Sequence, residues 1–258
     1  MRDPGLSEAI RAAGGVGELA RQIGISQPSV SNWIRIPAER VISVEAVTGV
    51  DRAVLRPDLY GERKVADDID EVDAARTQEY ALLAALLLRA PDAALLGKLS
   101  KLRADASPIG LAHAALAEAA AKTAAENVER EFFDLFIGIG RGELLPYGSY
   151  YLTGFLHERP LARLREDLAR IGVARAEGVV EPEDHAGILC EIMSGLAGRR
   201  LPAPPNSDQL IFEKHMASWI GRFFADLENA EAANFYKSVG ALGRVFMNIE
   251  TEAFALPA

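Results

Sequence analysis

Apolar residues recur at spacings of three and four along most of this chain, which is the pattern of helices that bury one face. Tyr80, Leu83 and Leu87 form one such series, and residues 95–102 contain another after a break at Pro91. No stretch alternates apolar and polar residues with period two beside a turn signal, so a sheet is not expected. The pattern predicts an all-α protein, with later helical segments at 108–137, 160–172, 182–197, 208–228 and 230–252.

The first sixty residues predict two short helices joined by a turn. Gly24 can adopt the positive φ that ends the first helix, and Ser26 is a candidate N-cap for the second. A second helix from Gln27 to Ile34 would complete a helix-turn-helix. Its inward face would consist of Leu19, Ala20, Ile23, Ile25, Val30 and Trp33.

Residues 5–61 resemble the Cro-like YdaS group of phage-type DNA-binding domains, which also carry an ending similar to Leu55-Arg56-Pro57-Asp58. The resemblance implies a small helix-turn-helix bundle whose recognition helix enters the major groove of DNA. The DNA-binding residues that it implies are Gln27, Ser29 and Asn32 against bases, and Ser31 or Arg35 nearer the phosphates.

The charge of this segment argues against strong DNA binding. Residues 1–60 carry seven arginines, seven acidic residues and no lysine, so their net charge is zero. Sequence-independent affinity for DNA comes from Lys and Arg side chains that neutralise phosphates. The segment therefore either binds DNA weakly, with a dimer on two half-sites, or has lost DNA contact and serves dimerisation or partner docking.

Charge also separates the chain near residue 62. The net charge of −9 lies entirely beyond residue 60, and residues 62–73 are rich in charge and poor in large apolar side chains. We expect a unit of residues 1–61, a charged linker of residues 62–73 and a helical unit of residues 74–258. An acidic second unit would repel nucleic acid and attract a cationic partner such as a basic peptide.

Composition indicates a cytoplasmic protein with a buried core. The chain is 49% hydrophobic, yet its longest apolar run, residues 80–88, has nine residues, about half of the ~20 that cross a membrane. The N-terminus lacks the apolar segment of a secretory signal. A single Cys190 can form no internal disulfide, and the four histidines show no metal-ligand spacing. We therefore expect no membrane span and no metal site.

Residues 181–185, Glu-Pro-Glu-Asp-His, form the most distinctive polar cluster. Proline suits a first helical position because it has no N–H to leave unpaired, and carboxylates suit the first turn because they face the positive end of the helix dipole. On the residues alone, a well-formed helix start at Pro182 explains the cluster.

Two further segments combine polar and aromatic residues. Residues 146–151, Pro-Tyr-Gly-Ser-Tyr-Tyr, are typical of a loop that enters a helix with Ser149 as its cap, and they suit a binding segment equally well. Phe212, His215 and Trp219 follow at spacings of three and four, which places them on one helix face. A buried core stripe would explain them without any other role.

In their order along the chain, 146–151, 181–185 and 212–219, the three segments resemble the signature of the TorD/DmsD family, cytoplasmic chaperones that escort molybdenum-containing redox enzymes. The family carries a motif like residues 181–185 after a glycine-bearing segment similar to residues 170–173, beside the groove implicated in binding the client's signal peptide. Gly148 departs from the family pattern, which often has an acidic or larger residue there. The signal-peptide-binding residues that the resemblance implies are Glu181, Glu183, Asp184, His185, Tyr147, Ser149, Tyr151, His215 and Trp219.

The resemblance also implies a function. The larger unit would bind the N-terminal signal region of a molybdopterin-dependent oxidoreductase, of the formate dehydrogenase or dimethyl sulfoxide reductase type. It would assist cofactor insertion and assembly before export, with no cofactor of its own. Carboxylates suit this task because they form charge-assisted pairs with the arginines of a twin-arginine signal. Weak guanine-nucleotide binding occurs in the family, although the chain has no GxxxxGK[ST] phosphate loop.

A different function remains open, namely a transcription regulator whose helical unit senses a client peptide. The proline-rich residues 199–206 would also allow protomers to exchange helices in a homodimer. An enzyme is not expected, because no nucleophile and base pair, metal cluster or phosphate cradle can be recognised.

Overall fold

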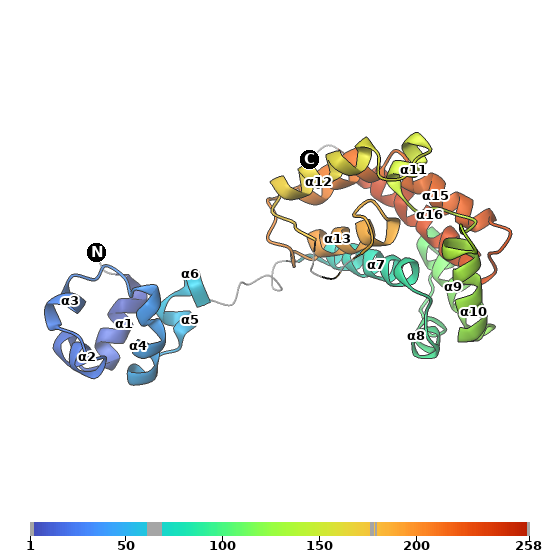
Figure 1. Cartoon of the computed structure of the whole chain (residues 1–258). Coiled ribbons are helices and arrows are strands. Elements are labelled where there is room, and N and C mark those ends of the chain that lie inside the picture. The colour runs from blue at the N-terminus through green and yellow to red at the C-terminus, as the bar shows by residue number, and fades with distance from the viewer. Residues whose placement is uncertain (1–2, 61–68, 176–177, 179, 257–258) are drawn as a thin grey trace. The chain divides into compact units, whose positions relative to one another are not determined.

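A computed structural model of the chain describes residues 3–60, 69–175, 178 and 180–256. The described residues are all-α, as predicted, and their only β-type pairing is an isolated bridge between Tyr147 and His185. The chain divides into two compact units, Met1–Asp68 and Ile69–Ala258, each with its own hydrophobic core (Figure 1). Most of the expected linker lies outside the described residues. Among the helices that are described, none is both long and apolar enough to span a membrane.

The small unit is a bundle of short helices. Its elements are α1 (Pro4–Ala12), α2 (Val16–Gln22), α3 (Gln27–Ser31), the 3₁₀ turn η1 (Ala38–Arg40), α4 (Val41–Thr48), α5 (Arg52–Leu55) and α6 (Pro57–Tyr60). Gly24 has φ 71° at the turn between α2 and α3, as the sequence predicts. Ser26 is the N-cap residue of α3, but its hydroxyl contacts the Ser29 hydroxyl at 2.7 Å instead of capping the helix.

Helix α3 is shorter than predicted, because it ends at Ser31 and not at Ile34. The Ile34 carbonyl accepts a hydrogen bond from the backbone N–H of Asp3 at 2.8 Å, and Ile36 is fully buried. These two anchors pull the chain back toward the core of the unit and stop the helix.

The larger unit is a layered helical bundle. Its elements are α7 (Glu71–Leu88), α8 (Ala93–Leu99), α9 (Pro108–Ala121), α10 (Ala125–Phe132), the π-helical turn η2 (Phe133–Ile137), α11 (Gly148–Thr153), α12 (Arg159–Arg170), α13 (Ala186–Ala197), α14 (Ser207–Ile211), the π-helical turn η3 (Phe212–Met216), α15 (Ile220–Asn229) and α16 (Phe235–Phe254). Helix α13 packs along α7, while α16 packs against α15 and α9 (Figure 1).

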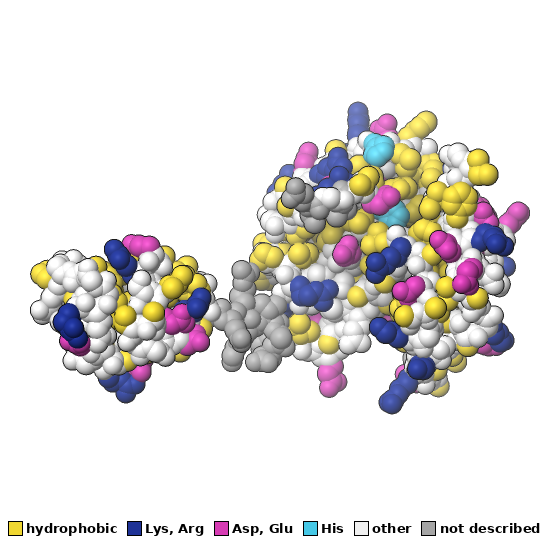
Figure 2. Space-filling view, turned by 60° about the horizontal axis from the view of Figure 1, so that its bottom comes forward, with side chains coloured by type: hydrophobic (Ala, Val, Ile, Leu, Met, Phe, Trp, Pro, Cys, Tyr) yellow, Lys and Arg dark blue, Asp and Glu magenta, His cyan; other side chains and the backbone are white. Residues whose placement is uncertain are grey.

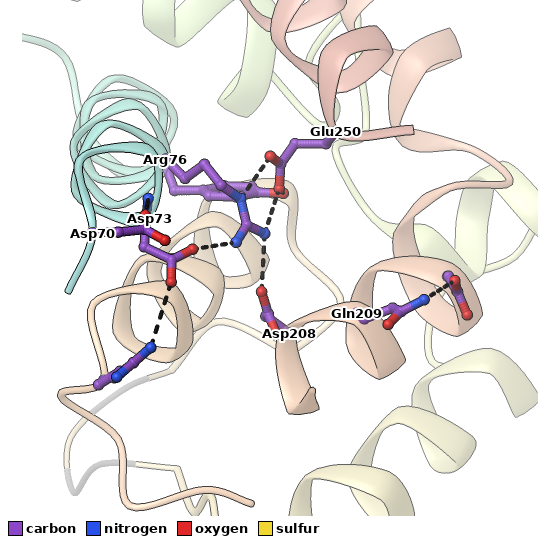
Figure 3. A network of polar contacts seen from close by, with 9 residues as sticks. Asp70, Asp73, Arg76, Asp208, Gln209 and Glu250 are labelled. Atoms are coloured by element: carbon purple, nitrogen blue, oxygen red, sulfur yellow. Dashed lines mark hydrogen bonds and ion pairs between the residues drawn. The ribbon is translucent and has the colours of Figure 1, made fainter. Parts of the chain in front are cut away.

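Helix α7 begins at Glu71, inside the segment expected to be the linker. The carboxylate of Asp70 caps it by accepting a hydrogen bond from the Asp73 N–H at 2.8 Å. Further along α7, Arg76 extends toward the C-terminal helix, where its Nε and Nη2 donate to Glu250 at 2.8 and 2.9 Å (Figure 3). The same guanidinium pairs with Asp73 and with Asp208 of α14, so one partly buried network joins α7, α14 and α16.

Several predicted helices are interrupted. The segment 108–137 consists of α9, α10 and the turn η2, and the segment 208–228 is broken between η3 and α15. The break leaves Trp219 with φ −143°, outside helical geometry, and its fully buried ring packs among Tyr151 and Phe223. Phe212, His215 and Trp219 therefore do not lie along one regular helix face as their spacing predicts.

The predicted helix start at Pro182 is wrong, because α13 begins at Ala186 with His185 as its N-cap. Two backbone hydrogen bonds tie the chain to residues 146–148 at this point. The Gly148 N–H donates to the Asp184 carbonyl at 2.9 Å, and the Ala186 N–H donates to the Pro146 carbonyl at 2.7 Å. The acidic residues thus form a loop that is tied to residues 146–148, and they do not occupy the first turn of a helix.

Candidate functional site

The loop of residues 181–185 and the segment of residues 146–151 meet in the larger unit, although they lie about 35 positions apart. Asp184 is the centre of this contact. Its side chain is 3% exposed, and Oδ2 accepts a hydrogen bond from the Ser149 N–H at 2.8 Å. Its other oxygen, Oδ1, has no hydrogen-bond partner among the described residues, and neither has the buried Ser149 hydroxyl. An unpaired buried polar group costs about 1–3 kcal/mol, so these two atoms are poised to accept a donor.

His185 is a neutral part of this arrangement. Its Nδ1 accepts a hydrogen bond from the Gly187 N–H at 3.0 Å, which assigns the ring proton to Nε2. Burial lowers the pKa of His185 to about 4, against the opposing effect of Glu181 and Asp184. The ring packs edge to face against Tyr147 at 5.1 Å between centroids. His185 therefore caps α13 and supports the loop without adding positive charge at neutral pH.

Tyr147 and Glu181 form the exposed side of the same contact. The Tyr147 hydroxyl donates to Glu181 Oε2 at 2.8 Å, and burial together with this carboxylate raises the pKa of Tyr147. A cavity of about 270 Å³ opens here, which we call the loop cavity. It is lined by Tyr147, Ser149, Leu156, His157, Val180, Glu181, Pro182 and Asp184.

Glu183 differs from its neighbours because its carboxylate is already neutralised. Arg165 Nε contacts one oxygen at 2.8 Å and Arg175 Nε approaches the other at 3.5 Å, with the Glu183 side chain 13% exposed. Of the three acidic side chains in the loop, only Glu181 and Asp184 therefore lack a guanidinium partner among the described residues.

His215 and Trp219 lie on the other side of Asp184. His215 Nε2 contacts the buried Asp167 at 2.9 Å, and Lys214 and Arg170 also pair with this carboxylate. Despite the burial of Asp167, these partners lower its pKa. A second cavity, of about 360 Å³, lies against Asp167, His215 and Asp184. Three basic partners thus occupy Asp167, while Asp184 lines this cavity as well as the loop cavity.

Trp219 supports the site from inside. Its Nε1 donates to the His215 carbonyl at 2.7 Å, and a Cβ at Gly148 would lie 3.1 Å from its ring. A larger residue at position 148 would therefore press on a buried indole, which explains why this chain has glycine there. Tyr151 packs on the same ring at 5.5 Å and donates its hydroxyl to Asp226 at 2.9 Å. Trp219 and Tyr151 position the segment and do not line the loop cavity.

An apolar groove of about 330 Å³ adjoins the acidic loop; the family resemblance implies a groove here, but sequence reasoning did not identify the residues that line it. Its apolar lining comes from the end of α12, the following loop, α13 and the residues after it. The groove is lined by Leu168, Val173, Ala174, Arg175, Glu181, Glu183, Ile188, Glu191, Ile192, Gly195, Arg200 and Leu201. Ile188 and Ile192 stand four positions apart directly after the acidic loop, and this spacing was the available signal.

Hydrophobic side chains also gather into a broad band on one face of the larger unit, with Arg, Lys, Asp and Glu around it (Figure 2). The described residues contain no cluster of His, Cys, Asp and Glu arranged to hold a metal ion. The combination of unpaired acceptors, carboxylates and an adjoining apolar groove can bind a cationic donor that is followed by an apolar chain.

In the small unit, the predicted DNA-facing side chains are all exposed: Gln27, Ser29, Ser31, Asn32 and Arg35. They come from the short α3 and the residues that follow it. Arg35 pairs with Asp58 at 3.4 Å, so its charge is partly neutralised within the unit.

Known families match both units. Residues 102–225 match the nitrate reductase delta subunit family, and residues 6–64 match the family of the bacterial toxin YdaS. Each family covers a separate part of the chain, on either side of the division between the two compact units.

Individual relatives are chaperones. The chaperone TorD of Vibrio atlanticus is 25% identical over 139 residues, which cover 50% of this chain and 65% of that protein. The Tat proofreading chaperone DmsD of Haemophilus influenzae is 28% identical over 119 residues, 45% of this chain and 57% of that protein. TorD of Shewanella loihica is 23% identical over 210 residues, which cover 72% of this chain and 96% of that protein. The chain thus spans less than two thirds of the first two relatives.

Proposed function

We propose that the larger unit, which matches the nitrate reductase delta subunit family and is similar to TorD and DmsD chaperones, is a chaperone for the maturation of a molybdopterin-dependent oxidoreductase. It binds the N-terminal signal region of this client, of the formate dehydrogenase or dimethyl sulfoxide reductase type. It holds the client while the cofactor is inserted and the enzyme is assembled before export. The protein acts in the cytoplasm and needs no cofactor for this task.

The unpaired acceptors at Asp184 and Ser149 are the observation that carries this proposal. A guanidinium group presents up to five N–H donors in a rigid fork, so one arginine can satisfy the Asp184 oxygen, the Ser149 hydroxyl and a neighbouring carboxylate together. Glu181 lines the same cavity of about 270 Å³. The loop cavity therefore suits a guanidinium better than an ammonium, which offers three donors from a single point.

The surroundings support a peptide as the ligand. A twin-arginine signal presents two guanidinium groups and then an apolar stretch. The apolar groove shares Glu181 with the loop cavity, so a chain that leaves the acidic loop can bury apolar side chains against Ile188 and Ile192. The net charge of −9, carried beyond residue 60, draws a cationic segment toward the unit.

Asp184→Asn is the variant that tests the proposal. The asparagine oxygen can still accept from the Ser149 N–H, while its amide group places a donor where the unpaired carboxylate oxygen was. We expect affinity for a peptide with two arginines and an apolar run to fall about 10- to 150-fold, because a hydrogen bond to a charged group contributes about 1.5–3 kcal/mol. Thermal stability should stay level or rise, because a buried and incompletely paired charge is removed.

The control is Glu129→Gln, which removes one negative charge from an exposed position on α10. Isothermal titration calorimetry with the peptide of two arginines and an apolar run compares the wild type and both variants. Binding that is equal in the wild type and Asp184→Asn would show that the loop cavity does not hold an arginine. If Glu129→Gln lost as much affinity for the peptide as Asp184→Asn, binding would depend on net charge alone.

We further propose that the small unit binds DNA, which would couple regulation to the chaperone or make the protein a regulator that senses its client. Support comes from the match of residues 6–64 to the YdaS family and from the exposed side chains on and after α3. The absence of lysine in the first sixty residues predicts weak binding by one protomer.

A gel-shift series at low salt with fragments of the source genome tests this second proposal. Retardation by the wild type that Asn32→Ala and Gln27→Ala abolish would support base contacts from this segment. No retardation at the lowest salt concentration would refute DNA binding. The small unit would then serve dimerisation or the docking of a partner.

A further inference from the structure

Arg175 occupies the acidic end of the apolar groove. Its Nη2 donates to the Val180 carbonyl at 3.3 Å and also to the Glu181 carbonyl, and its Nε lies 3.5 Å from Glu183 Oε1. The groove of about 330 Å³ counts Arg175, Glu181 and Glu183 among its lining residues. A guanidinium of the chain itself thus holds a carboxylate and two carbonyl oxygens at the position where the groove meets the acidic loop.

We propose that Arg175 is an intramolecular competitor of the arginine-bearing ligand. It lowers the affinity of the groove for this ligand, because the ligand's guanidinium must displace the Arg175 guanidinium. The inference rests on the proposed function, because it concerns the same ligand. An incoming guanidinium can take over the contacts of Arg175 one by one, since the two groups have the same donors. A ligand without a guanidinium cannot replace these contacts and leaves Arg175 in place.

The contacts of Arg175 are of the kind that can be released. Its side chain is 35% exposed, and its approach to Glu183 is longer than the 2.8 Å contact of Arg165 with the same carboxylate. Exposed ion pairs contribute little to stability because water replaces them at almost equal free energy. Arg165 remains to neutralise Glu183 from α12, so the loop keeps one of its anchors when Arg175 leaves.

The affinity of Arg175→Gln measures the competition. Glutamine removes the charge and shortens the side chain, so the Glu183 carboxylate and the two carbonyls become available to the ligand. We expect a peptide with two arginines and an apolar run to bind about three- to tenfold more tightly, the range for a weak exposed ion pair with its accompanying hydrogen bonds. Arg159→Gln on α12, where the arginine is also exposed, is the charge-matched control and should bind like the wild type.

A second peptide, in which glutamine replaces both arginines, separates exchange from a loosened loop. If Arg175→Gln gains affinity only for the arginine peptide, the competitor is confirmed. A similar gain for both peptides would attribute the effect to a wider groove and overturn the inference, and so would unchanged or weaker binding of the arginine peptide. Failure of the wild type and of Arg175→Gln to bind the arginine peptide would refute the proposed function itself and the inference with it.

Discussion

Replacement of Glu250 by glutamine is expected to destabilise the larger unit by about 3 kcal/mol, the lower end of the range for breaking a buried ion pair. The Glu250 side chain is 1% exposed, and it accepts hydrogen bonds from Arg76 Nε and Nη2 and from the Tyr80 hydroxyl at 2.8, 2.9 and 2.8 Å. The variant keeps the shape of the side chain, so the measured loss reports the charge and its hydrogen bonds.

The expected magnitude follows from what remains around Arg76. Breaking one partner of a buried pair costs about 3–5 kcal/mol, since it leaves an uncompensated charge. Asp73 and Asp208 still contact the guanidinium at 2.9 Å each, so its charge stays partly neutralised (Figure 3). This remaining compensation places the expected cost at the lower end of the range.

Urea unfolding at pH 7, followed by tryptophan fluorescence, measures this cost. The chain has two tryptophans, one in each unit, so the background variant Trp33→Phe leaves Trp219 as the reporter of the larger unit. The control Glu252→Gln is exposed on the same helix and should change the free energy of unfolding by less than about 0.5 kcal/mol. Combination with Arg76→Met should show a coupling energy above about 1 kcal/mol.

Two results would refute this reasoning. A loss below about 1 kcal/mol in Glu250→Gln would mean that water or the remaining acids replace the carboxylate at little cost. A coupling energy near zero would mean that Arg76 and Glu250 stabilise the unit independently, and the network would then not act as one connection between α7 and α16.

The remaining predictions concern packing and pH. Gly243→Ala should destabilise the larger unit by about 1–3 kcal/mol through overpacking, because the new Cβ would lie 2.2 Å from the buried Phe224 ring. Gly97→Ala has no atom within 4 Å of its new Cβ and should stabilise α8 by about 0.5–1 kcal/mol. Urea unfolding measures the free energy of both variants. The hydrogen bond that His113 Nε2 donates to the Glu79 carboxylate at 2.9 Å raises the pKa of His113, so the stability from this pair is complete below the unfolded pKa and is lost as pH rises through the folded pKa. His113→Gln should therefore cost more at pH 6 than at pH 8.5, and equal costs at both pH values would contradict the assignment.

Much of the helical framework could be predicted because its signals are local. The all-α class follows from the spacing of apolar residues, and the turn after α2 follows from Gly24, whose φ is 71°. Element boundaries were less predictable wherever distant residues intervene. Helix α3 ends early because the Asp3 N–H binds the Ile34 carbonyl, and α13 starts late because backbone hydrogen bonds tie residues 184–186 to residues 146–148.

For the candidate site, the sequence identified the residue types but not their tasks. Glu183 belongs to the same motif as Asp184, yet two arginines from α12 and the following loop occupy it. Trp219 follows the spacing of a helix face, yet it is buried behind Gly148. Such differences depend on which side chains approach through space, and periodicity carries no information about that.

The sequence by itself determined the helical class, the concentration of negative charge beyond residue 60 and the chemical character of residues 181–185, because these depend on residue type and local spacing. Only the tertiary structure decided that Asp184 keeps one buried oxygen unpaired beside the Ser149 hydroxyl, at the edge of an apolar groove. The physical reason is that the hydrogen bonds between residues 146–149 and 184–186 join segments about 35 positions apart, and their geometry exists only in the folded chain.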